Sequence, residues 1–415
     1  MKLWSRHLIL ALTAGTVVWL IGTALTGHAS AQAGKDAPKA GKAAPATVKG
    51  TVKGTPANAS AYPPTTGPNR PPAGVFFKNV STSTLKGLSV DDFMGAMGVM
   101  AAALGFDCSD CHPGAGSDKV DWVFDTPKKI TARKMTEMVA TINRNNFGGT
   151  DAGKVTCWTC HHGREVPATT IALDKLYGAP NDEKDDVILQ APEVPTATQI
   201  LDKYIAAVGG AAKVNTLKSF IATGTSVGYE RLGGGGTFEI YAKAPEMHVT
   251  QIVFKDRPER GDSTRSYNGK TGFIKTPRSL LGEYELSGGE LSGARLDAML
   301  CFPGEIKQAL TNWRSGYSDV IGDTDVEVVQ GNGPNGLLAT LYFNQKTGLL
   351  VRMVRYTNSP IGHVSTQTDY SDYRDVGGIK FPFQYTFSWL DGKDQFQLSK
   401  VQVNAPIDDS KFGKP

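Results

Sequence analysis

The chain has 415 residues, 40% of them hydrophobic and 20% charged, which is long enough for two or three globular domains. Its net charge of +4 is unevenly distributed, because residues 1–75 hold eight Lys or Arg and one Asp. These residues sum to +7, so the remaining residues, 76–415, have a net charge of −3. A slightly acidic folded part gives little support for nucleic-acid binding.

The N-terminal segment has the pattern of an export signal. Lys2 and Arg6 precede an apolar run over residues 8–25, and Ala29-Ser30-Ala31 follows as a small-residue cleavage site. This predicts a signal peptide over residues 1–31, with an uncleaved anchor as the alternative. The protein is therefore expected in the periplasm or on the outer face of the cytoplasmic membrane.

Residues 32–75 are rich in Ala, Pro, Gly, Lys and Thr and contain almost no large apolar side chains. Such a composition cannot bury a core, so we expect a disordered linker. Its lysines could touch an anionic lipid surface, but a merely solvated linker is the simpler interpretation.

Two C-x-x-C-H motifs occupy residues 108–112 and 157–161. In each, two thiols three residues apart can add to the two vinyl groups of one haem, and the next His can bind the iron. The motifs predict two covalently bound c-type haems. The attachment residues are Cys108, Cys111, Cys157 and Cys160, and the iron ligands are His112 and His161.

Two other kinds of site use a C-x-x-C pair. A thioredoxin-like redox couple normally lies in a βαβ setting, and half of a zinc site would leave the two adjacent histidines unexplained. The repeated His favours haem. The fifth cysteine, Cys301, has apolar neighbours and is expected to pack as a small buried side chain.

A helix is predicted before each motif. Ser89 can cap a helix that ends at Gly105, and Thr126-Pro127 begins a second helix that ends at Gly148-Gly149. Both carry methionines, and Met is a frequent ligand opposite His in cytochromes c. Spacing alone leaves the choice open in each helix. The candidates are Met94, Met97 and Met100 in the first, and Met135 and Met138 in the second.

The same region resembles the cytochrome subunit of photosynthetic reaction centres. The resemblance covers roughly residues 76–170 and is carried by Met97, Leu104-Gly105 and the first motif, then by residues 132–138, Ile142-Asn143 and 155–161, with Gly163 and Pro167. It implies a helical haem domain in which Met97 and Met135 are the sixth iron ligands.

Three features depart from that family. The family carries four haems, whereas this chain has two motifs. Residues 143–156 contain no His, which agrees with the absence of the further haem that the family binds there. His162 replaces the usual Arg after the second motif, and we expect it at the surface rather than on the iron. A link to photosynthesis is thereby left open.

The charges near the two motifs differ. Residues 88–112 contain four Asp and no Lys or Arg, whereas residues 126–145 contain five Lys or Arg and one Glu. Positive surroundings stabilise reduced haem, so this predicts the higher potential for the second haem. The basic helix could also attract an acidic partner.

Residues 171–196 are polar and Pro-rich and are expected to be a linker. From residue 197 a short amphipathic helix gives way to strands, such as the alternating residues 381–389. We expect an α+β domain over residues 197–415, dominated by a curved antiparallel sheet. Its pattern weakly resembles the half-barrel of periplasmic lipoprotein carriers, which implies a lipid or quinone site. A packed docking module is the alternative.

These features together predict a multidomain electron-transfer protein, not an enzyme. An α-helical dihaem cytochrome c domain at residues 76–170 would pass single electrons between a redox donor and acceptor, which could be part of a membrane complex. One alternative is a peroxidase-like haem enzyme with an open iron position. Another is a lipid or quinone carrier or sensor with haem input.

Overall fold

The computed structural model describes residues 71–117, 119–148, 154–170, 173–176, 187–228, 235–254, 262–276 and 282–415. The predicted signal peptide and nearly all of the predicted linker 32–75 lie outside these residues. No helix in these ranges is both long and apolar enough to span a membrane.

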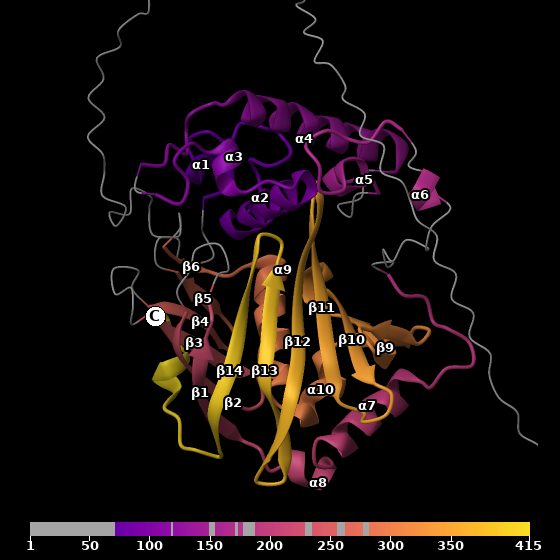
Figure 1. The fold of residues 1–415 in the computed structure, drawn as a ribbon. Coiled ribbons are helices and arrows are strands. Elements are labelled where there is room, and N and C mark those ends of the chain that lie inside the picture. Colours follow the sequence, from indigo (N-terminus) through magenta and orange to yellow (C-terminus); the bar gives the residue numbers. More distant parts are fainter. Residues whose placement is uncertain are drawn as a thin grey trace, which may run out of the picture. The chain divides into compact units, whose positions relative to one another are not determined.

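The first part of the described chain is helical (Figure 1). Its helices are α1 (Ala73–Phe76), α2 (Val90–Leu104), α3 (Cys108–Cys111), α4 (Pro127–Asn146), α5 (Cys157–His161) and α6 (Leu173–Leu176). Three of the four predicted ends of the two long helices are confirmed, and the fourth differs slightly, since α4 ends at Asn146 rather than at Gly148. The Ser89 hydroxyl accepts from the N–H of Asp92, Gly105 ends α2 in the left-handed region, and the Thr126 hydroxyl accepts from the N–H of Lys129.

The second part contains one antiparallel sheet of 14 strands. The strands are β1 (Ser219–Ser226), β2 (Gly236–Lys243), β3 (Met247–Val253), β4 (Ser263–Asn268), β5 (Gly272–Lys275), β6 (Glu283–Glu285), β7 (Thr311–Ser315), β8 (Asp319–Ile321), β9 (Thr324–Asn332), β10 (Leu338–Asn344), β11 (Leu350–Ser359), β12 (Gly362–Val376), β13 (Ile379–Trp389) and β14 (Gly392–Val403).

The sheet order is β6-β5-β4-β3-β2-β1-β14-β13-β12-β11-β10-β9-β7, with β8 paired to β9. Most neighbours in the sheet are also consecutive in sequence, so hairpins build it. A turn that contains Lys346-Thr347-Gly348 joins β10 to β11. The predicted curved antiparallel sheet is confirmed.

Further helices accompany the sheet: α7 (Ala197–Ala207), α8 (Ala211–Val214), α9 (Gly288–Leu300) and α10 (Ile306–Ala309), with 3-10 turns at Pro303–Glu305, Pro334–Gly336 and Asp409–Phe412. Helix α9 contacts β3, β4 and β11, so it covers one face of the sheet, and α7 packs on β7 and β9. The sequence pattern did not predict α9.

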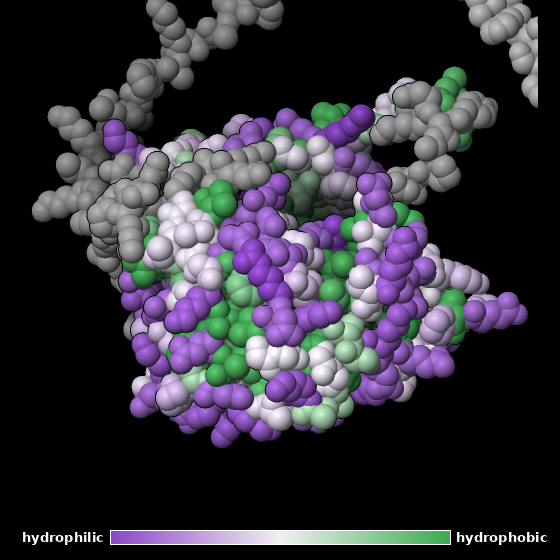
Figure 2. Space-filling model, turned by 60° about the horizontal axis from the view of Figure 1, so that its bottom comes forward, coloured by the Kyte–Doolittle hydropathy of each residue, from purple (hydrophilic) through white to green (hydrophobic). Residues whose placement is uncertain are grey.

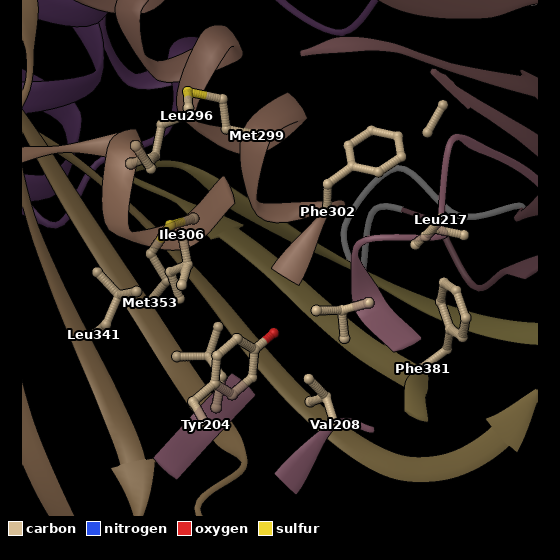
Figure 3. Close-up of a cluster of buried hydrophobic side chains, with 14 of the residues drawn as sticks. Tyr204, Val208, Leu217, Leu296, Met299, Phe302, Ile306, Leu341, Met353 and Phe381 are labelled. Atoms are coloured by element: carbon tan, nitrogen blue, oxygen red, sulfur yellow. The ribbon is translucent and has the colours of Figure 1, made fainter. Parts of the chain in front are cut away.

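The main hydrophobic core lies between the sheet and these helices (Figure 3). Tyr204 of α7, Met299 of α9 and Met353 of β11 are each at most 5% exposed. This face of the sheet is thus filled by packed side chains, which fits the docking-module alternative. The outer surface seen in Figure 2 is mostly hydrophilic around a smaller hydrophobic area.

Two hairpins of the sheet reach the helical part. The turn between β11 and β12 places Ile361 in a second hydrophobic cluster with Phe93 and Val99 of α2. Leu390, in the turn between β13 and β14, packs against the same cluster. Two residues of the predicted linker also bind the sheet: the N–H of Ile188 donates to the side chain of Gln330 in β9, and the N–H of Ala191 donates to the carbonyl oxygen of Ser315 in β7. The domain boundaries at 76–170, 171–196 and 197–415 stay predictions.

Candidate functional site

The first C-x-x-C-H motif folds as the single helical turn α3. The Asp107 carboxylate accepts a hydrogen bond from the backbone N–H of Ser109 at 2.8 Å, and the Asp110 carboxylate accepts one from the N–H of Asp107 at 2.9 Å. This reciprocal capping fixes the turn from both sides. Cys108 is exposed, Cys111 is half-buried, and both are free thiols.

The second motif folds in the same way as α5. The Thr156 hydroxyl accepts from the N–H of Thr159 at 3.2 Å, and the Thr159 hydroxyl accepts from the N–H of Thr156 at 3.0 Å. Cys157 is half-buried, Cys160 is exposed, and again neither forms a disulfide. In both turns the two cysteines are three residues apart, which places them on one side of a helical turn.

The two motif histidines have different surroundings. His161 Nδ1 lies 2.9 Å from the carbonyl oxygen of Arg164. A ring whose Nδ1–H donates to a carbonyl keeps Nε2 free to bind a metal, which is the usual arrangement of a metal-binding His. His162 takes a left-handed backbone conformation, and its exposed ring lies 5.4 Å from that of Trp158.

His112 is half-buried, with its ring 5.0 Å from the ring of Trp122. Its Nδ1 is buried and has no hydrogen-bond partner among the described residues. Burial and the charge of Lys129 lower the pKa of His112 to about 4. The ring is therefore neutral near pH 7, and the neutral imidazole is the form that binds iron.

Three of the four motif thiols, those of Cys108, Cys111 and Cys157, do not have the lowered pKa of a reactive redox cysteine. Burial raises the pKa of Cys157 to about 11, and it also raises the pKa of Cys108 and of Cys111. Reactive cysteines in C-x-x-C couples have lowered pKa values, because the thiolate is the nucleophile. The thioredoxin-like alternative therefore loses support.

The helices pack in a crossed arrangement. Helix α2 packs against α5, the second motif, and α4 packs against α3, the first motif. At one contact the N–H of Gly163 donates to the carbonyl oxygen of Ala103 at 2.9 Å. At the other, the Thr126 hydroxyl donates to the carbonyl oxygen of Cys111 at 3.2 Å. Each motif therefore packs against the long helix that precedes the other motif in the sequence.

A close approach explains why α2 ends in Gly105. A Cβ atom at this position would lie 2.4 Å from the carbonyl oxygen of Gly163, and the φ of Gly105 is 67°. Both conditions exclude a side chain. The glycine therefore ends the helix and also lets the segment after the second motif lie against it.

The methionine candidates lie on the two long helices. Met94, Met97 and Met100 are half-buried beside the cluster of α1 and α2. Met135 is half-buried, whereas Met138 is 43% exposed. Gly95 of α2 faces Val364 of β12. Met97 is two residues from Gly95, so it lies on the opposite side of the helix. The ligand roles of Met97 and Met135 stay predictions.

The charges differ from the expected distribution. Lys128, at the start of α4, lies 3.4 Å from Asp110 inside the first motif and 3.9 Å from Glu165 after the second. Lys129 donates to the carbonyl oxygens of Trp122 and Phe124, beside His112. The basic start of α4 therefore lies at the first motif, because α4 packs on α3. Lys128 thus lies near both motifs, and the higher potential expected for the second haem stays a prediction.

Comparison with known protein families finds a match that includes both motifs. Residues 30–195 match the family model described as the photosynthetic reaction centre cytochrome C subunit. The resemblance seen over residues 76–170 is confirmed, and the match extends beyond it on both sides. The matched family is one of electron carriers rather than enzymes, and it indicates a cytochrome-like function and an extracytoplasmic protein. No curated protein matches the chain.

Solved structures match about half of the chain. A LolA superfamily protein from Nitrosomonas europaea is 13% identical, with 53% of this chain and 99% of that chain covered and a TM-score of 0.35. A DUF1329 family protein from Desulfovibrio piger is 13% identical (53% and 98%, TM-score 0.36). An outer membrane lipoprotein-sorting protein domain from Vibrio parahaemolyticus is 10% identical (51% and 94%, TM-score 0.35).

Proposed function

We propose that the protein is an exported dihaem c-type cytochrome that passes single electrons between redox partners. The observation that carries the proposal is the pair of capped C-x-x-C-H turns with free thiols, in which the His161 Nδ1 contacts the Arg164 carbonyl. The match of residues 30–195 to the cytochrome subunit family supports it.

Cys108 and Cys111 would hold one haem, and Cys157 and Cys160 the other. Each thiol adds across one vinyl group, the sulfur bonding to one carbon and the hydrogen to the other, so the attachment needs no external oxidant or reductant. Haem, when bound, supplies the one-electron iron couple. His112 and His161 would bind the iron through Nε2.

Met97 and Met135 would each supply a thioether ligand to one iron. A thioether there favours the reduced iron and fills the position that a peroxidase-like enzyme would leave open for its substrate. The electron-carrier proposal and the enzyme alternative therefore differ in whether the sixth position is free. Strong cyanide binding by the purified protein would favour the enzyme.

The predicted signal peptide at residues 1–31 supports export to the periplasm or the outer face of the cytoplasmic membrane. Donor and acceptor would then be redox proteins or a membrane complex on that side. A lipid or quinone at the sheet stays a prediction, which mass spectrometry of an organic extract of the purified protein tests.

The decisive experiment is expression with a haem-attachment system, followed by mass spectrometry and a pyridine haemochrome assay on the same sample. The expected result is two covalent haems per chain. Cys111→Ser and Cys160→Ser should each remove one thioether bond, whereas Cys301→Ser should leave both haems fully attached. A wild-type protein without covalent haem would refute the proposal.

A further inference from the structure

The turn between β11 and β12 contacts the second motif directly. The backbone N–H of Cys157 donates to the carbonyl oxygen of Ile361 at 3.0 Å. Cys157 is the first residue of α5, and the first N–H groups of a helix have no acceptor within that helix. A residue of the sheet thus satisfies this group on the cysteine itself. Ile361 is fully buried, so the contact is shielded from water.

The shape of the turn requires a glycine beside this contact. Gly362 has a φ of 153°, and a Cβ atom there would lie 2.8 Å from Val99 of α2 and 3.5 Å from Thr156, which caps α5. The Ser359 hydroxyl donates to the Gly362 carbonyl oxygen at 2.7 Å and fixes the turn internally. The turn therefore fits closely against both α2 and the second motif.

A second hairpin reaches the first motif. Leu390, between β13 and β14, lies 3.4 Å from where a Cβ atom of Gly98 would be. The next residue, Asp391, lies close enough to Cys108 for its carboxylate to contribute, after burial, to the raised pKa of that thiol. Both motifs thus have a hairpin of the sheet beside them.

From these contacts we propose that the β11–β12 turn positions the second haem site, with Ile361 and Gly362 as positioning residues that act through Cys157. The inference rests on the proposed haem function and adds to it a role for the sheet. A change in the turn would move Cys157 and, four residues on, His161. It would also admit water beside the attachment site. Both effects alter a haem potential, and water favours the more highly charged oxidised iron.

The test is a potentiometric titration of the full-length holoprotein carrying Gly362→Ala. We expect the midpoint potential of one haem to fall while the other is unchanged. Gly322→Ala is the matched control, because Gly322 also has a positive φ (59°) but a Cβ atom there would meet no other atom within 4 Å. It should introduce backbone strain without a steric clash and shift neither potential.

A second variant separates positioning from general damage. Val99→Ala in the Gly362→Ala background removes the side chain that the new methyl group would meet, so the potential should return towards the wild-type value. Unchanged potentials in folded, two-haem Gly362→Ala would overturn the inference and leave the haem function intact. Equal shifts of both haems, or no recovery in the double variant, would also overturn it. A wild-type chain without covalent haem would instead remove the haem function on which the inference rests.

Discussion

The carboxylate of Asp91 accepts hydrogen bonds from both the backbone N–H and the hydroxyl of Ser287, 196 residues later in the chain, at 2.7 and 2.8 Å. Asp91 is in the first turn of α2, and Ser287 is the N-cap of α9. The helical part therefore caps a helix of the sheet part, just as Ile361 of the sheet part caps α5. These two reciprocal contacts fasten α2 and the second motif to the sheet.

Asp91→Ala should lower the free energy of unfolding by about 2–3 kcal/mol, because a buried charged acceptor is removed and Ser287 loses its partner. Urea denaturation measures this. Asp92→Ala is the neighbouring control and should cost less, because within the described residues Asp92 accepts only from the nearby Ser89 hydroxyl, and burial raises its pKa although that hydrogen bond opposes the shift. Equal losses in both variants would contradict a specific role for Asp91.

Arg355 should be essential for the stability of the sheet. It is 1% exposed, and its guanidinium nitrogens lie 3.5 Å from Asp297 and 3.8 Å from Glu290 of α9. Arg355→Leu removes the buried partner of Glu290 and one of the two basic partners of Asp297, which keeps Arg265 at 3.4 Å, and should cost about 3–5 kcal/mol. The control Arg374→Leu breaks an exposed pair with Asp372 and should cost much less than Arg355→Leu. A similar cost for both, measured by urea denaturation, would contradict this prediction.

The stability of the protein should depend on pH because of His248, whose pKa changes on folding. Burial lowers its pKa from 6.5 to about 4, while Asp297 raises this pKa and Arg265 lowers it by smaller amounts. Between these values the unfolded chain binds more protons than the folded one, so stability should fall as the pH falls from about 6.5 to 4. The slope from this group is at most about 1.4 kcal/mol per pH unit.

His248→Asn should flatten that dependence over this range and leave the pH dependence above pH 7 nearly unchanged, because His248 is neutral there in both the folded and the unfolded state. Unfolding free energies from urea denaturation at several pH values give the slope for each protein. An identical slope in wild-type and variant between pH 4 and 6.5 would contradict the assignment to His248.

Lys128 should raise the potential of the haem at the first motif, since its charge lies beside Asp110. Lys128→Gln removes a positive charge near that haem and should lower its midpoint potential, by on the order of tens of millivolts. Lys134 of the same helix is exposed, so Lys134→Gln is the control and should have a smaller effect. A drop confined to the other haem would contradict the crossed packing of α4 on α3.

Met135 and Met138 can be separated by single substitutions. Met135→Leu should abolish the sulfur-to-iron charge-transfer band of one haem and lower its potential, because a thioether ligand favours reduced iron. Met138→Leu should change neither. The opposite pattern in the absorption spectrum and titration would make Met138 the ligand.

Much of the local structure was predictable because its causes are local. Ser89 and Gly105 bound α2 through hydrogen bonds and a backbone conformation that involve only near neighbours. The alternating Phe381 and Phe383 indicate a half-buried strand for the same reason. Helix α9 was missed because its buried face includes Gly289, Ser292 and Gly293, which create no hydrophobic periodicity.

Residue type and short spacing were enough to identify the two C-x-x-C-H motifs and to predict the strand-rich character of residues 197–415. The packing of α4 on the first motif, the capping of α9 by Asp91 and the contact of Ile361 with Cys157 became known from the folded structure alone. Those contacts join residues far apart in the chain. They depend on how whole helices and hairpins pack, and no short sequence pattern encodes that packing.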